Sequence, residues 1–101
     1  MKALAKFKLF TQSKNFDDYI FWNKIPKEYK YVAIDSKDSI TTTGVIAFKA
    51  GIPVAYTDKP TLIDGRWVQS VKPRYAPIVV PKEAIIGELP SSAESLRERS
   101  V

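Results

Sequence analysis

The feature that most constrains this fold is the dipeptide Asp64-Gly65, which separates two short runs, Thr61–Ile63 and Arg66–Gln69. A two-residue type I′ turn needs positive φ at both positions, and Asp and Gly tolerate that backbone better than most residues. The runs on either side contain β-branched and aromatic residues typical of strands. The chain is therefore expected to reverse direction here as a β-hairpin.

Alternating residue types predict further strands along the chain. Period-two patterns extend over residues 2–10, 29–35, 44–50, 54–57 and 76–80. Lysines on one face of the first run suit an exposed edge strand, because charge discourages edge-to-edge pairing. Prolines within and directly after the last run restrict it to a short edge strand, since proline cannot donate to a ladder.

One helix is expected near the start of the chain. Asn15 is a suitable N-cap for a helix over Phe16–Asn23, and Asp17 and Asp18 fall in its first turn, where the helix dipole favours negative charge. Pro26 ends this helix, because the residue before a proline avoids the helical region.

A second, shorter helix is expected at the C-terminus. Ser91 and Glu94 have capping-box spacing before Leu96. So short a helix is marginal alone, and it either frays or docks on a partner subunit.

These elements together predict an α+β fold. A mostly antiparallel sheet of about five strands packs against the first helix, and residues 1–88 form one domain with a short helix or tail over 89–101. Eleven apolar residues are expected in the core: Phe16, Ile20, Trp22, Val32, Ile34, Ile46, Val54, Leu62, Trp67, Val68 and Ile78.

Composition excludes several kinds of chemistry. The 101 residues include neither cysteine nor histidine, so disulfides, Cys- or His-based zinc sites and Ser–His or Cys–His catalytic pairs are impossible. We therefore expect a binding protein rather than an enzyme, with no cofactor and no metal. No apolar stretch approaches the roughly 20 residues that span a bilayer, and Lys6 and Lys8 interrupt any signal-peptide core. The expectation is a cytoplasmic protein without a membrane partner.

The net charge of +5 permits an anionic partner, and aromatic residues that neighbour basic ones suggest where it binds. Rings that stack on bases and cations that contact phosphates are the minimum equipment for a nucleotide or a single-stranded nucleic acid. Five residues form the candidate ligand site, the first three for phosphate and the last two for stacking: Arg66, Lys72, Arg74, Tyr56 and Tyr75.

Four aspartates offer an alternative, a site for a hard cation or for acid–base chemistry. Asp35 and Asp38 flank one strand end, and Asp58 and Asp64 bracket the hairpin. Turns explain all four more simply, because an Asp side chain bonds the nearby backbone.

A longer pattern runs through the middle of the chain. It reads Trp22-x-x-x-Pro26-x-x-Tyr29-x-Tyr31-Val32-Ala33-Ile34-Asp35, then Val54-Ala55-Tyr56-x-x-Lys59-Pro60, then Gly65-x-Trp67. Over about residues 20–68 this resembles small uncharacterised proteins encoded by bacteriophages. The chain departs from them where their short Asp-x-x-Gly turn is replaced by the longer segment 36–51, which contains an extra strand.

The resemblance implies a soluble accessory protein in the host cytoplasm. Some such proteins resemble anti-CBASS sponges, which sequester the cyclic nucleotide signals of antiphage defence and are homo-oligomers. The functional hypothesis is therefore non-catalytic binding of a cyclic dinucleotide, or a similar anionic nucleotide, by a homo-oligomer. A nucleic-acid- or host-protein-binding inhibitor and a small structural virion protein are the alternatives.

Overall fold

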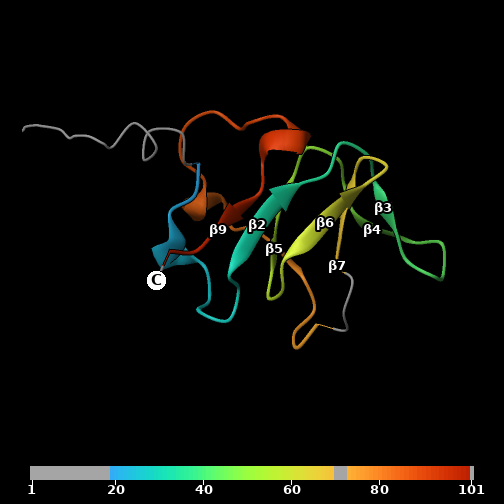
Figure 1. The fold of residues 1–101 in the computed structure, drawn as a ribbon, viewed down its shortest axis with the longest axis horizontal. Helices are drawn as coiled ribbons and strands as arrows, with labels where there is room; N and C mark the ends of the chain where they lie inside the picture. Colours follow the sequence, from blue (N-terminus) through green and yellow to red (C-terminus); the bar gives the residue numbers. More distant parts are fainter. Residues whose placement is uncertain (1–18, 70–72, 101) are drawn as a thin grey trace, which may run out of the picture.

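The computed structural model describes residues 19–69 and 73–100, and this part of the chain is built mostly from short β-strands (Figure 1). Three 3₁₀ turns are its helical elements: η1 (Trp22–Lys24), η2 (Lys82–Ala84) and η3 (Ser92–Glu94). The strands in chain order are β2 (Tyr31–Ile34), β3 (Ser39–Ile40), β4 (Ile46–Phe48), β5 (Pro53–Tyr56), β6 (Pro60–Ile63), β7 (Arg66–Gln69), β8 (Ile78–Val79) and β9 (Arg97–Glu98).

The strands form one central sheet and two hairpins. The antiparallel sheet has the order β8-β5-β2-β9, while β3–β4 and β6–β7 are separate two-stranded sheets. The inner strands β2 and β5 are buried along nearly their whole length. Side chains alternate across a sheet, so this burial means that both faces of the central sheet are covered.

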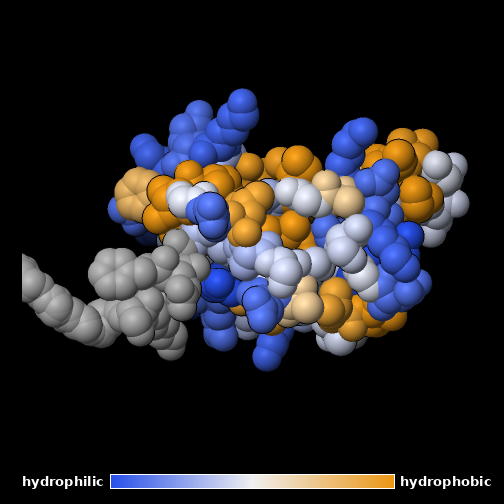
Figure 2. Space-filling model, turned by 90° about the horizontal axis from the view of Figure 1, so that it is seen from above, coloured by the Kyte–Doolittle hydropathy of each residue, from blue (hydrophilic) through white to orange (hydrophobic). Residues whose placement is uncertain are grey.

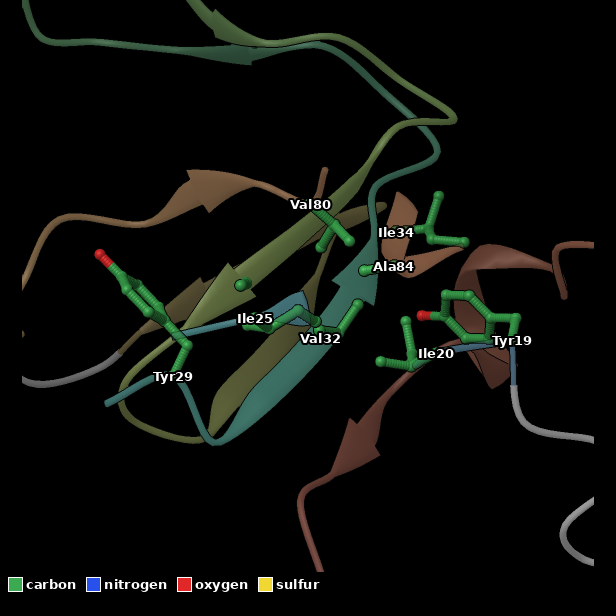
Figure 3. Close-up of a cluster of buried hydrophobic side chains, with 9 residues drawn as sticks. Tyr19, Ile20, Ile25, Tyr29, Val32, Ile34, Val80 and Ala84 are labelled. Carbon is green, nitrogen blue, oxygen red and sulfur yellow. The ribbon is translucent and has the colours of Figure 1, made fainter. Parts of the chain in front are cut away.

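One face carries the larger core. Val32, Ile34 and Ala55 pack there against the segments 19–29 and 80–84. Figure 3 shows these buried side chains converging from β2 and from both flanking segments. Segments far apart in sequence therefore cover one face, and within residues 19–69 and 73–100 no α-helix takes part.

The opposite face is covered by the β6–β7 hairpin and by the C-terminal segment. Ala33, Val54 and Tyr56 lie on this face and pack against the partly buried Trp67 and Leu96. The Trp67 indole also donates a hydrogen bond to the carbonyl of Ser92, at 3.1 Å. This contact ties the hairpin to η3.

The helix expected over 16–23 is wrong for the residues that the structure describes. Ile20 forms an antiparallel bridge with Ile85, and the amide of Phe21 donates to the carbonyl of Ala84 at 2.7 Å. Pairing with this distant segment holds the backbone at Ile20 and Phe21 extended. The 3₁₀ turn η1 then takes the place of the end of the expected helix. Aromatic and β-branched residues are weak helix formers and offer little resistance to this pairing. Residues 16–18 lie outside the described part, as does the strand expected over 2–10.

The expected C-terminal helix is also wrong, so the α+β assignment gives way to a mostly β fold. Ser92–Glu94 makes a single 3₁₀ turn, and the chain then continues as β9 beside β2. The Ser95 hydroxyl accepts from the amide of Ile34 at 2.8 Å and donates to the carbonyl of Ser92 at 2.7 Å. The pairing of β9 with β2 and the hydrogen bonds of the Ser95 hydroxyl take the place of the backbone hydrogen bonds that a helix would make. Arg97 and Glu98 are thus part of the central sheet.

The Asp64-Gly65 hairpin is confirmed. The φ angles are 52° at Asp64 and 81° at Gly65, and β6 pairs with β7 in the register that a two-residue turn gives. The short strand at 78–79 lies at the edge of the sheet, as the prolines around it indicate.

The expected core is only partly correct. Four of its members are buried: Ile20, Val32, Ile34 and Val54. Trp22, Trp67 and Ile78 are half-buried against the clusters, and Phe16 lies outside the described residues. Ile46, Leu62 and Val68 are exposed on the two hairpins. Leu62 and Val68 lie on opposite faces of the β6–β7 hairpin, because they pair with Trp67 and Thr61 respectively. In the described ranges, no helix has the length and apolar character needed to cross a membrane.

Candidate functional site

Three loops meet at the end of the central sheet where β2 begins and β5 ends, and we call this region the loop end. It comprises residues 24–30, 57–59 and 73–77. Tyr31 pairs with Tyr56 at this end, and the amide of Lys30 donates to the carbonyl of Tyr56 at 2.9 Å. The antiparallel register therefore brings loops together that are far apart in sequence (Figure 1).

Tyr29 fixes the third loop in place. Its ring is buried, and its hydroxyl donates to the carbonyl of Ala76 at 2.7 Å. Its ring centroid lies 6.4 Å from that of Tyr75, with the planes tilted by 41°. Such tilted aromatic contacts are mildly stabilising. A buried tyrosine thus supports an exposed one.

Arg74 and Tyr75 combine a cation with an accessible ring. The Arg74 guanidinium carbon lies 5.8 Å from the centroid of the Tyr75 ring, and both side chains are exposed. An aromatic ring that is accessible to solvent can stack on a base. A neighbouring guanidinium can pair with a phosphate through two parallel hydrogen bonds. Two of the five predicted site residues are therefore together at the surface.

Lysines of the other two loops lie at the same end of the sheet as this pair. Lys27, Lys30 and Lys59 are exposed at the loop end, as are the carboxylates Glu28 and, in part, Asp58. Cations outnumber anions there, so the local potential favours an anionic ligand. These lysines are not among the five site residues predicted from the sequence. Lys27 and Lys30 precede β2 and Lys59 follows β5. Antiparallel pairing of these two strands would have predicted that the three lysines lie at the same end of the sheet.

Arg66 lies at the other end of the sheet. Its Nε donates to the carbonyl of Asp38 at 2.9 Å, and its guanidinium is 3.9 Å from the Asp64 carboxylate. Asp38 follows β2, whereas Tyr29 precedes it, so β2 separates Arg66 from Tyr75. Arg66 therefore does not join the loop-end group, and its role is to hold the β6–β7 turn against the loop after β2.

Tyr56 is also outside the group that the loop end presents to solvent. It is 4% exposed, and its hydroxyl points to the carbonyl of Trp67 at 3.4 Å. Burial and the nearby Asp35 carboxylate raise the pKa of its phenol. A ring packed in this way has no face for a ligand base. Lys72 lies outside the described residues.

Asp35 and Asp38 accept hydrogen bonds from backbone amides distant in sequence, rather than from the nearby backbone of their own turns as expected. The Asp35 carboxylate accepts from the amide of Trp67 at 2.6 Å, and that of Asp38 accepts from the amide of Ala50 at 2.8 Å. Burial raises the pKa of Asp35, whereas the hydrogen bond and charge of Lys37 lower the pKa of Asp64. Among the residues described, no three acidic side chains gather in a group suited to a metal ion.

Known proteins add no information about this site. Comparisons with family models, with curated proteins and with solved structures find no match to the chain. What the chain binds is therefore inferred from the loop end itself.

Proposed function

We propose that this chain is a non-catalytic binding protein that sequesters a cyclic dinucleotide at its loop end, as a bacteriophage accessory protein does in the host cytoplasm. The observation that carries the proposal is the exposed pair Arg74 and Tyr75. The buried ring of Tyr29 contacts that of Tyr75. Its phage context comes from the sequence resemblance over residues 20–68.

The chemistry of the pair fits a nucleotide better than a simple anion. An exposed ring adds about 1–3 kcal/mol for each base that stacks on it. Arg74 supplies a planar, permanently charged partner for phosphate, and the lysines at the same end of the sheet add attraction at longer range. A cyclic dinucleotide offers two bases and two phosphates in one compact ligand. Arg74 and Tyr75 engage one base and one phosphate of it.

The test is thermal unfolding with cyclic di-GMP, cyclic di-AMP and cyclic GMP–AMP as probes. Ligand at about 100 times its Kd stabilises the folded state by about 2.7 kcal/mol, which raises Tm by roughly 10 °C or more for a domain of this size. We expect Arg74→Ala and Tyr75→Ala to abolish most of the shift. Each shift is measured against the same variant without ligand.

Arg66→Ala is the matched control, because it removes the same type of side chain at the other end of β2. We expect it to leave the ligand-induced shift unchanged. Loss of the shift in Arg66→Ala with retention in Arg74→Ala moves the site away from the loop end. No shift with any of the three probes refutes the proposal.

Salt dependence separates the alternative partners. The logarithm of the association constant for a single-stranded oligonucleotide falls linearly with the logarithm of the salt concentration. The slope is about −0.7 for each phosphate that the protein neutralises. The cyclic dinucleotide has only two phosphates, so we expect a shallow slope. Tight oligonucleotide binding with a steep slope, and no cyclic dinucleotide binding, favours the nucleic-acid-binding alternative instead.

A further inference from the structure

The β3–β4 hairpin, residues 39–48, projects from the central sheet. All residues from Ile40 to Ala47 are exposed, and no third strand pairs with the hairpin in the described chain. Three of its aliphatic side chains are among the most exposed large apolar residues: Ile40 at 54%, Val45 at 63% and Ile46 at 47%. Figure 2 shows orange apolar and white side chains, with blue hydrophilic ones beside them, at the right-hand end, where Figure 1 places this hairpin.

Hydrogen bonds close the β3–β4 hairpin at its turn and across its strands. The amide of Thr41 donates to the carbonyl of Val45 at 2.9 Å, and the amide of Phe48 donates to the Ser39 hydroxyl at 3.1 Å. Its base is anchored by Asp38, whose carboxylate accepts from the amide of Ala50. These bonds restrict the backbone of the hairpin, and a restricted surface loses less entropy on binding.

The charge pattern of the chain singles out this hairpin. Residues 39–48 are the longest run without a charged residue in a chain of 27 charged residues. The run contains no proline either, so neither charge nor proline guards its strands against edge pairing; their short length and the register shift at Ser39/Ile40 are the guards that the structure shows. An anionic or cationic partner finds nothing complementary here.

We infer that this hairpin is the interface through which two copies of the chain form a symmetric dimer. A two-fold axis brings identical surfaces together, so self-association of a protein with net charge +5 is repelled wherever that surface is basic. The uncharged hairpin avoids this repulsion, and Ile40 and Ile46, which pair across β3 and β4, supply one apolar surface. The inference is independent of the proposed ligand site, which lies beyond the other end of β2.

The dimer is expected to be weak. Stable interfaces bury about 800 Å² on each partner and involve about 20–30 residues a side, and a ten-residue hairpin provides less than this. We expect a Kd on the order of 10 μM. The dimer then breaks up on dilution within a measurable range.

Sedimentation velocity of the full chain from about 1 to 200 μM tests the inference. The expected result is a mass that rises from 11.4 kDa toward twice that value and no further. Ile46→Lys places two like charges in the interface and should weaken association at least tenfold. Ile86→Lys is the matched control, because Ile86 is also 47% exposed but lies outside the hairpin.

Val45→Lys repeats the test at the turn, where strand pairing is not disturbed. Thermal unfolding confirms that each variant is folded before its mass is interpreted. The inference is overturned by a wild-type mass that stays at 11.4 kDa at every concentration, by growth beyond a dimer, or by folded hairpin variants that associate like the wild type.

Discussion

Substitution of Arg99 is expected to be the most damaging single change near the C-terminus. The guanidinium donates to four backbone carbonyls of the segment 22–29: Tyr29 at 3.1 Å, Trp22 at 3.3 Å, Ile25 at 2.9 Å and Pro26 at 3.0 Å. It also lies 4.7 Å from the centroid of the Trp22 ring. One side chain thus clamps the first described segment onto the end of the chain.

The magnitude follows from these contacts. A hydrogen bond to a charged group contributes about 1.5–3 kcal/mol, so four independent bonds would give roughly 6–12 kcal/mol. The four bonds share one half-buried side chain, and water reaches some of the carbonyls once it is removed, so they are not additive. With about 0.5–1 kcal/mol for the ring contact, Arg99→Ala should cost about 2–4 kcal/mol.

Chemical denaturation at pH 7 measures this loss as a change in the free energy of unfolding. The corresponding fall in Tm is roughly 8–30 °C. Arg99→Lys keeps the charge but lacks the planar set of donors, so we expect it to recover at most about half of the loss.

Arg74→Ala is the control for Arg99→Ala. Arg74 is exposed, and its contact in the structure is the Tyr75 ring, so its removal should change stability by less than about 0.5 kcal/mol. If Arg99→Ala and Arg74→Ala unfold alike, the clamp contributes nothing to stability, and the reasoning from its hydrogen bonds is refuted.

Two further substitutions test local features. Gly65→Ala should cost more than Gly44→Ala in denaturant unfolding. Both have positive φ, worth about 1–2 kcal/mol, but only at Gly65 does an added Cβ fall 2.7 Å from the Ser36 hydroxyl oxygen; equal losses would contradict this. Burial raises the folded-state pKa of Asp35 above 3.8, so its contribution to stability is lost as pH rises from that value through the folded pKa. The Tm of Asp35→Asn minus the Tm of the wild type should therefore increase from about pH 4 to about pH 7. A Tm difference that stays constant over this range would show that Asp35 does not titrate in this way.

The sequence predicted local features well where a few neighbouring residues decide the backbone. The turn at Asp64-Gly65 is such a case, because positive φ at two adjacent positions depends on those two residues alone. The strands β2 and β5 were also recognisable from their residue types. The helix near Phe21 failed, because its capping signals are local whereas the bridge between Ile20 and Ile85 spans most of the chain.

The five predicted site residues are only partly together, again because local patterns do not give tertiary positions. Arg74 and Tyr75 are sequence neighbours in an irregular segment, and they lie together at the surface. Arg66 and Tyr56 were joined to them by residue type only. Their positions depend on the packing of the β6–β7 hairpin, which buries Tyr56 and directs Arg66 toward Asp38.

By itself, the sequence determined the chemical limits and the turns of this protein. The lack of cysteine and histidine excludes whole classes of site, and the Gly and Pro positions punctuate the strands. Only the tertiary structure decided what covers the sheet. Both faces of β2 and β5 are buried by hairpins and extended segments, and Arg99 and Ser95 fasten the C-terminus through backbone groups more than 60 residues away in the chain. Such contacts have no signature in a local pattern, because every backbone carbonyl is the same acceptor until folding selects its partner.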